Sequence, residues 1–281
     1  MTDNFLEELN ITTSAIKCPY FGILYSLPGA GKTWLCSYAP KPFYIAVEKG
    51  VEQLSDVGRF TDKDGKLFKP HDSTQFYKMM GHFVQNDHEY KTIIIDSAKF
   101  VEHLFIDNII ARNPTEKKKD ETVQVESIGD YNFGTGYAKL LTYWERFIKG
   151  VDALNSRGIN VILIAHARDK NASTIGGEEF KRTGLDLSEF GQYSVPNLLY
   201  ARCDWMFFMR SESQTVERKK QFGGTKTVAS EGKPDIVLYT RAKSGFDAKI
   251  RTADIENIDD FYTIDINDQD TSKKIFTDLE K

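Results

Sequence analysis

Apolar residues gather in short runs along this chain, and polar stretches separate the runs. Six runs are rich in β-branched and aromatic residues and have the length of a β-strand. The third and fourth are apolar without a break, which is typical of strands buried on both faces of a parallel sheet. The six runs span residues 20–25, 43–47, 92–95, 160–165, 205–209 and 235–239.

Between these strands, apolar residues recur at the three- and four-residue spacing of amphipathic helices. The clearest helix starts at Tyr137 and stops at Arg157-Gly158, and 100–110 has a similar pattern. A weaker pattern covers 75–84, with Ser73 as a possible cap. Alternating strands and helices predict an α/β fold with a mainly parallel, wound sheet flanked by helices. In such a fold, functional sites lie at the carboxyl ends of the strands.

Three polar segments are expected to be loops: 112–130, 167–188 and 217–232. The first carries a charged run from Lys117, and the last contains three successive cations and a Gly-Gly pair, which suggests a basic hairpin. Each segment fits either an ordinary surface loop or a contact with nucleic acid, and the sequence leaves both interpretations open.

The composition is that of a folded protein. Of 281 residues, 40% are hydrophobic, and the formal net charge is −4 with a pI of about 5.8. This hydrophobic fraction argues against a mainly disordered chain, and the length allows one large domain or two small ones. The acidic balance argues against a surface coated in positive charge, but it leaves room for a local basic groove.

The three cysteines, Cys18, Cys36 and Cys203, are widely spaced and form no C-x-x-C pair. We therefore expect neither a disulfide framework nor a cysteine metal site, as in a reducing cytosol. The acidic start of the chain lacks the apolar region of a secretory signal, and no apolar run is long enough to span a bilayer. The expected location is the cytoplasm, with no membrane partner.

A glycine-containing segment follows the first predicted strand and precedes a helix-like stretch. This order predicts a phosphate-binding loop, in which backbone N–H groups turn inward and a helix directs its positive end at the phosphates. Lys32 is expected to reach the β- and γ-phosphates and Thr33 to bind Mg²⁺. Ser26 stands where the pattern has its first glycine. The expected nucleotide contacts are Pro28, Gly29, Ala30, Gly31, Lys32, Thr33 and Trp34.

Three polar residues each follow a predicted strand. Asp96 is expected to hold Mg²⁺ together with Thr33, although it could instead cap the next helix. Glu48 is expected to orient or deprotonate the attacking water if its strand neighbours the phosphate-loop strand; the alternative is an exposed glutamate. His166 is expected to contact the γ-phosphate, although a lone histidine is often structural.

These segments together resemble the RecA-like ATPases, and among them the phage-type ATP-binding family that includes the Sak-type single-strand annealing ATPases. The matching pieces are 25–33, 42–50, 93–97, 134–137, 161–166 and, more weakly, 203–208.

The resemblance implies a RecA-like P-loop NTPase core over residues 17–265, between an N-terminal arm, 1–16, and a C-terminal tail, 266–281. It places the phosphate-loop strand beside the strands of Glu48 and Asp96, and adds a late antiparallel hairpin. It also implies that Glu48 is the catalytic carboxylate, acting with Lys32, and that His166 senses the γ-phosphate.

Assembly into a filament or ring is a further implication, with a neighbouring subunit completing the site. Lys249 and Arg251 have the i, i+2 spacing of cations supplied in trans, although they also fit a solvated edge strand. DNA binding follows from the family and from cations that could line a single-strand groove or simply face solvent, with Phe180 or Phe222 available for stacking. These cations are Arg168, Lys170, Lys181, Arg182, Arg218, Lys219 and Lys220.

The leading hypothesis is a Mg²⁺-dependent ATPase that binds single-stranded DNA in phage-type recombination, annealing or repair, in the host cytosol if a phage encodes it. Its expected ligands are ATP and Mg²⁺, and a single-strand-binding protein is a candidate partner. The second hypothesis is a nucleotide-gated loader or switch with little turnover. A P-loop kinase ranks third, because Glu48 and His166 suit water activation better than transfer to an organic acceptor.

Overall fold

The computed structural model describes most of the chain. Among the residues singled out above, Glu48, Lys220 and Phe222 lie outside the described part, as does the predicted arm 1–16. The described residues are 18–46, 50–119, 121–173, 179–212, 215–219, 225–229, 235–251, 258–265 and 269–280.

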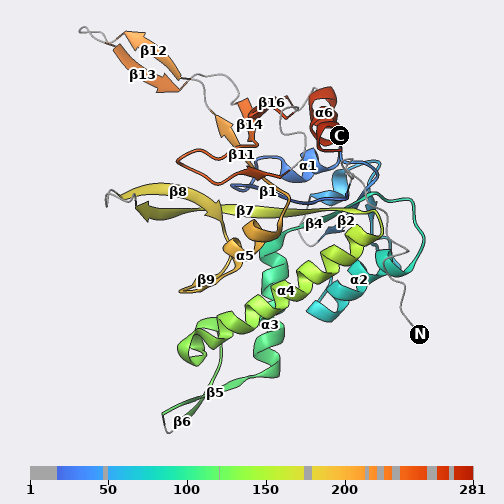
Figure 1. Ribbon diagram of the computed structural model, residues 1–281, viewed down its shortest axis with the longest axis vertical. Coiled ribbons are helices and arrows are strands. Elements are labelled where there is room, and N and C mark those ends of the chain that lie inside the picture. Colours follow the sequence, from blue (N-terminus) through green and yellow to red (C-terminus); the bar gives the residue numbers. More distant parts are fainter. Residues whose placement is uncertain are drawn as a thin grey trace, which may run out of the picture.

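A large twisted sheet forms the centre of the molecule (Figure 1). Its strands follow the order β16-β14-β11-β1-β7-β4-β2-β3, and the neighbours from β11 to β3 are parallel. The late strands β14 and β16 are antiparallel, which confirms both the mainly parallel sheet and the late antiparallel strands. The bounds are β1 (Phe21–Ser26), β2 (Pro42–Ala46), β3 (Gly58–Arg59), β4 (Thr92–Asp96), β7 (Asn160–Ser173), β11 (Trp205–Glu212), β14 (Asp235–Tyr239) and β16 (Phe261–Ile264).

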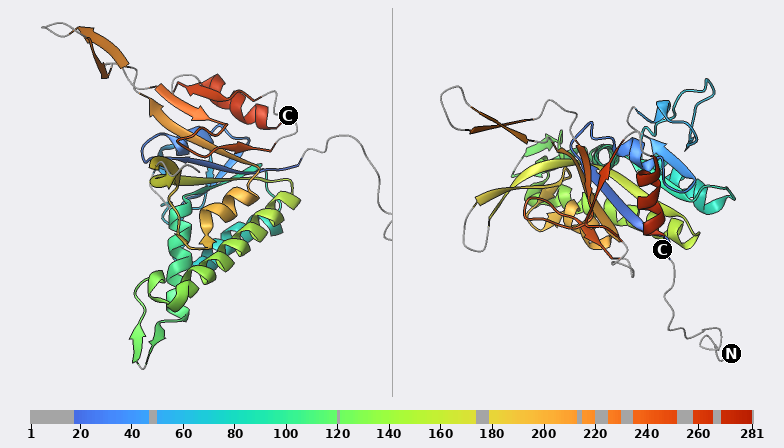
Figure 2. Two further views of the ribbon diagram at one scale, coloured as in Figure 1. Left: turned by 60° about the vertical axis from the view of Figure 1, so that its left-hand side comes forward. Right: turned by 90° about the horizontal axis from the view of Figure 1, so that it is seen from above.

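Helices cover both faces of the sheet, as Figures 1 and 2 show. On one face, aromatic side chains such as Phe76, Phe105 and Trp144 join α2 to α5 to the sheet in one apolar cluster. On the other face, Leu35 and Phe276 bring α1 and α6 into a second cluster. The helices are α1 (Lys32–Cys36), α2 (Ser73–Gln85), α3 (Ala98–Arg112), α4 (Thr135–Ser156), α5 (Val195–Arg202) and α6 (Gln269–Leu279), with short 3₁₀ turns η2 (Val51–Gln53), η3 (Ile128–Asp130) and η4 (Asn132–Gly134).

Strand β1 can lie close to β11 because it contains Gly22. A Cβ atom at this position would come within 2.0 Å of the indole ring of Trp205, which is 2% exposed. The glycine therefore gives the large ring its place over the middle of the sheet, beside the strand that leads into the phosphate loop.

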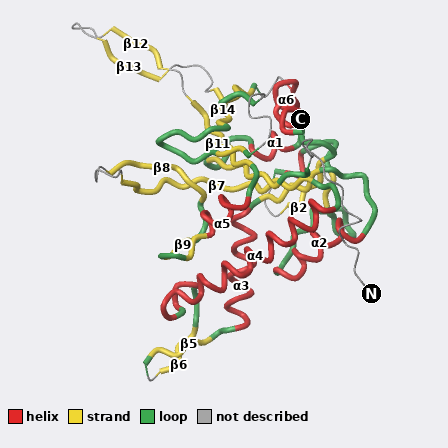
Figure 3. Tube along the Cα trace, in the orientation of Figure 1, coloured by secondary structure: helices red, strands yellow, loops and turns green. Residues whose placement is uncertain are grey.

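Four hairpin-like pairs extend this core. The segment 112–130, expected to be a loop, instead contains the hairpin β5–β6 and the turn η3. Most of 167–188 is also regular, because β7 continues past the sheet and pairs with β8. The hairpins β5–β6 and β12–β13 project from opposite ends of the molecule (Figures 2 and 3). The strands are β5 (Thr115–Lys118), β6 (Glu121–Gln124), β8 (Glu179–Leu185), β9 (Glu189–Phe190), β10 (Tyr193–Ser194), β12 (Thr215–Lys219), β13 (Thr225–Ala229) and the short β15 (Lys249–Ile250) on β11.

Other expectations need correction. The segment 266–281, expected to be a tail, contains α6, whose Ile275 and Phe276 are buried against the sheet. The cap of α2 is Asp72, which accepts a hydrogen bond from the N–H of Gln75, and not Ser73. The strands of Glu48 and Asp96, expected beside β1, are also not its neighbours. Strand β7 lies between β1 and the Asp96 strand β4, and both β7 and β4 lie between β1 and the strand that leads to Glu48. No helix among the described residues is long and apolar enough to cross a membrane.

Candidate nucleotide site

The loop between β1 and α1 has the backbone of a phosphate cradle. Gly29 and Gly31 adopt φ angles of 81° and 91°, in the left-handed region that glycine enters without strain. Gly31 is also the N-cap of α1, so the first N–H groups of the helix begin directly at the loop. Free helix N–H groups and the helix dipole both favour an anion at this place.

Lys32 lies over this loop and is buried, with 5% of its surface exposed. Its Nζ atom donates to the Oγ of Ser26 at 2.8 Å and lies 3.3 Å from the carbonyl oxygens of Ser26 and Leu27. The hydroxyl of Ser26, at the position where the sequence pattern has glycine, thus holds the lysine. These three oxygens are neutral, and an ammonium bonds more strongly to the charged oxygens of a polyanion, so Lys32 can exchange them for phosphate oxygens.

Thr33 and Asp96 meet across the same edge. The Thr33 hydroxyl donates to Oδ2 of Asp96 at 2.7 Å, and the backbone oxygen of Thr33 accepts a hydrogen bond from Tyr44 at 2.6 Å. The N-cap of α3 is Ser97, so Asp96 does not act as that cap. A hydroxyl and a carboxylate are the oxygen ligands that Mg²⁺ prefers beside a phosphate. These two residues therefore fit the predicted metal position.

His166 lies at the same edge because β7 is the direct neighbour of β1. It is in register with Ser26, and Ala165 is in register with Tyr25. On its other side, β7 pairs with β4, and Asp96 of β4 is in register with Ile164. Strand β7 therefore lies between the strand that leads to the Lys32 loop and the strand that ends at Asp96. Lys32, Thr33, Asp96 and His166 are thus brought together, while the place of Glu48 lies outside the described residues.

Lys249 and Arg251 lie toward the other end of the sheet. Lys249 pairs with Met206, which is opposite Ile23 near the start of β1. The Lys249 ammonium donates to the backbone oxygen of Tyr200 and lies 4.8 Å from the centre of its ring, and the Arg251 guanidinium donates to the oxygen of Ala201 at 2.9 Å. Both cations therefore serve the last carbonyls of α5 in this subunit, and a role in trans stays a prediction.

The cations expected to bind DNA differ in their surroundings. Arg168 lies 3.5 Å from Asp186, Lys170 lies 2.7 Å from Glu189, and Arg182 forms an ion pair with Asp247. Lys181 is exposed, and the backbone of Arg218 and Lys219 belongs to β12. Ion pairs at such partly exposed positions are weak, so they could open to a phosphate, but they do not by themselves indicate a DNA site.

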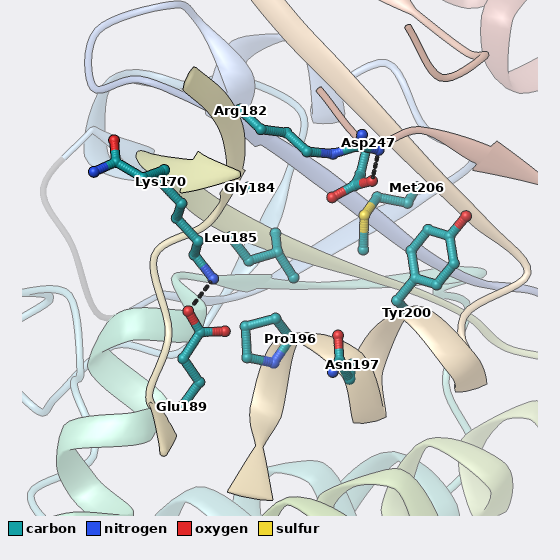
Figure 4. Close-up of a pocket in the computed structure, with 11 residues that line it drawn as sticks. Lys170, Arg182, Gly184, Leu185, Glu189, Pro196, Asn197, Tyr200, Met206 and Asp247 are labelled. Atoms are coloured by element: carbon teal, nitrogen blue, oxygen red, sulfur yellow. Dashed lines mark hydrogen bonds and ion pairs between the residues drawn. The ribbon is translucent and has the colours of Figure 1, made fainter. Parts of the chain in front are cut away.

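Lys170 and Arg182 also line a pocket of about 350 Å³ under the β7–β8 hairpin (Figure 4). The sequence pattern does not identify the other residues that form its walls. Besides the hairpin strands β7 and β8, they come from β9, α5, β11 and the segment before β15, and no local spacing connects these distant pieces. The residues missed in this way include Leu185, Asn197, Tyr200, Met206 and Asp247.

The loop, its buried lysine and the Thr33–Asp96 pair define the nucleotide site of a P-loop protein. A family model described as an AAA domain matches residues 19–252, which is most of the chain. The chain therefore belongs to the AAA domain family of P-loop ATPases. No curated protein matches the chain. The finer resemblance to the RecA-like, Sak-type group stays a prediction.

Proposed function

We propose that this protein is a Mg²⁺-dependent ATPase whose turnover is stimulated by single-stranded DNA in recombination, annealing or repair. The observation that carries the ATPase part is the meeting of Lys32 with the Thr33–Asp96 pair at the carboxyl edge of β1 and β4. Membership in the AAA domain family supports the same activity.

Each residue has a distinct task in this proposal. The N–H groups after Gly29 surround the phosphates, and Lys32 exchanges its loop oxygens for phosphate oxygens. Thr33 and Asp96 hold Mg²⁺, which neutralises the phosphate charge. The imidazole N–H of His166 donates a hydrogen bond to a γ-phosphate oxygen, and Glu48 orients the attacking water.

Binding of DNA is supported by the shape of the molecule. Two hairpins, β7–β8 and β12–β13, project beyond the sheet, and each carries cations in its sequence. Lys181, near the start of β8, is exposed. A strand of DNA gains most of its affinity from such phosphate contacts, so binding is expected to weaken steeply with salt.

The first test measures phosphate release with and without Mg²⁺ and with and without a single-stranded oligonucleotide. We expect Mg²⁺-dependent turnover that the oligonucleotide increases and that Lys32→Ala abolishes. Absence of oligonucleotide binding at low salt, together with an unchanged rate, would remove the DNA part of the proposal. Unchanged turnover in Lys32→Ala would remove the ATPase part.

One observation also favours a nucleotide-gated switch. A single strand, β7, passes from His166 at the phosphate edge directly into the projecting hairpin with β8. A contact between His166 and the γ-phosphate could thus shift the hairpin without requiring rapid turnover. This second function gains support if Glu48→Gln leaves the rate of phosphate release unchanged while ATP and ADP give different affinities for the oligonucleotide.

A further inference from the structure

The pocket under the β7–β8 hairpin has an apolar interior. Leu185 and Met206, which are 3% and 2% exposed, form part of its lining, and Pro196 of α5 adds a further apolar surface. Tyr200, also on α5, stands at one side of the opening in Figure 4 and is 40% exposed. A cavity of about 350 Å³ with this lining lies within the size range of small-molecule sites, roughly 300–1,000 Å³.

Charges on the rim of this pocket compensate one another. Lys170 pairs with Glu189 at 2.7 Å, and Arg182 pairs with Asp247. A free anion therefore meets a carboxylate beside each cation and gains little from entering. The remaining polar side chains that line the pocket are neutral: the amides of Asn171 and Asn197 and the hydroxyl of Tyr200. The pocket thus fits a neutral, flat group that has polar atoms on its edge.

We propose that this pocket receives one unstacked base of single-stranded DNA. The inference rests on the proposed function and names the site at which that DNA is held. A base presents a flat face to the Tyr200 ring and edge donors and acceptors to Asn197, and stacking on an aromatic ring tolerates every base. The phosphates stay outside, near the exposed Lys181, which has no carboxylate within 4.0 Å among the described residues.

The same pocket is connected to the phosphate loop through Asp247. The hydroxyl of Tyr25 donates to the backbone oxygen of Asp247 at 2.5 Å, while the Asp247 carboxylate holds Arg182. Tyr25 directly precedes Ser26, whose hydroxyl accepts from Lys32. A base that displaces the Arg182–Asp247 pair can therefore shift Tyr25 and change the position of Lys32. This connection gives the bound DNA a route to the rate of hydrolysis.

The first experiment compares two labelled oligonucleotides of equal length, oligo-dT and an abasic strand with the same phosphates, by fluorescence anisotropy. We expect the wild-type protein to bind oligo-dT about tenfold or more tightly than the abasic strand, because the abasic strand cannot stack. Tyr200→Leu is expected to lose this preference and Tyr200→Phe to keep it. Phe261→Leu, which changes an exposed aromatic on β16, serves as the control.

The second experiment tests the connection. Tyr25→Phe keeps the ring and removes only the hydroxyl, so we expect oligo-dT affinity to persist while stimulation of phosphate release by oligo-dT is lost. Stimulation equal to that of the wild type would overturn the connection.

The outcomes separate the two levels of the proposal. If the wild type binds neither strand, the proposed DNA function fails, and the pocket assignment fails with it. If the wild type prefers oligo-dT and folded Tyr200→Leu retains the same preference, the pocket assignment alone is wrong. If Tyr200→Leu retains the preference for oligo-dT but the sedimentation coefficient of the protein falls, the pocket receives a segment of a second copy of this chain instead.

Discussion

Thr33 and Asp96 are 63 positions apart in the chain, yet the hydroxyl of Thr33 donates to the carboxylate of Asp96 at 2.7 Å. Thr33→Val keeps the shape of the side chain and removes the hydroxyl. We expect Mg²⁺-dependent ATP binding to weaken about 10- to 100-fold, because the proposed metal ligand and a hydrogen bond to a charged group are lost. Titration calorimetry with and without Mg²⁺ measures this change.

Thr142→Val is the matched control for this substitution. Its hydroxyl donates to the Ala138 carbonyl on the exposed side of α4, and it has no role in the proposed nucleotide site. Equal ATP affinity in Thr33→Val and Thr142→Val would show that Thr33 is not a metal ligand.

Lys32→Met is expected to lower the rate of ATP hydrolysis by about 100-fold or more, because removal of one preorganised donor at a developing negative charge typically costs that much. The methionine is one atom shorter than the lysine and keeps an unbranched apolar stem in the buried position. Lys41→Met is the control, since Lys41 is exposed and forms only a surface ion pair with Glu89 at 3.5 Å. Retained turnover in Lys32→Met, with the protein folded, contradicts the assignment of the phosphate site.

Gly22→Ala is expected to destabilise the fold by about 1–3 kcal/mol, because the new methyl group would overlap the Trp205 ring in a packed core. Gly81→Ala is the matched control. Gly81 lies inside α2, and a methyl group added there would meet no atom within 4 Å, so this change should stabilise the protein by about 0.5–1 kcal/mol. Urea unfolding measures the change in the free energy of unfolding, which should have opposite signs in the two variants. An unchanged stability in Gly22→Ala would mean that Trp205 can move aside.

The three cysteines should react very differently with a thiol reagent near pH 8. Cys18 is exposed, whereas Cys36 and Cys203 are buried. Burial raises the pKa of Cys203 to about 11 and the pKa of Cys36 well above its usual value. Because the thiolate is the reactive form, one thiol should react within minutes and two more only after denaturation. Rapid reaction of two or three thiols in the native protein would contradict this packing.

Glu102 predicts a dependence of stability on pH. It is fully buried, and burial raises the pKa of its carboxyl group, although hydrogen bonds from Ser188 and the charge of Lys99 oppose the shift. A pKa that is higher in the folded state means that the proton stabilises the fold. The contribution of the protonated Glu102 carboxyl to stability is fully present below the unfolded pKa of 4.5. It is lost as the pH rises through the higher pKa of the folded state.

The measurement is urea unfolding of the wild type and Glu102→Gln at several pH values from about 4.5 to about 8. The stability of the wild type relative to the variant should fall as the pH rises, since glutamine does not titrate. A constant difference across this range would show that the folded and unfolded pKa values of Glu102 are equal.

The local parts of this structure could be predicted from the sequence. The phosphate loop needs only a strand, a glycine turn and a lysine in order, and these are adjacent in the chain. Strand β4 and its terminal Asp96 are likewise evident from a short apolar run. Such features depend on interactions among near neighbours, which a spacing pattern records.

Long-range pairing could not be predicted in the same way. The neighbours of β1 are β7 and β11, whose partner residues for Gly22 are Ile162 and Trp205, and nothing in the apolar pattern specifies which strands meet. The expected contacts of β1 with the Glu48 strand and with the Asp96 strand were therefore wrong. The pocket was missed for the same reason, because Tyr200, Met206 and Asp247 come from separate segments.

The order of strands in the sheet also has a consequence for synthesis on the ribosome. Strand β1 emerges early, but Tyr20 meets its partner Asn160 only after 140 more residues have been made. At about 5–20 residues per second, this apolar strand waits roughly 7–28 s without either neighbour. The nascent protein therefore exposes an aggregation-prone edge during translation, and it cannot acquire a complete nucleotide site until β7 has left the exit tunnel.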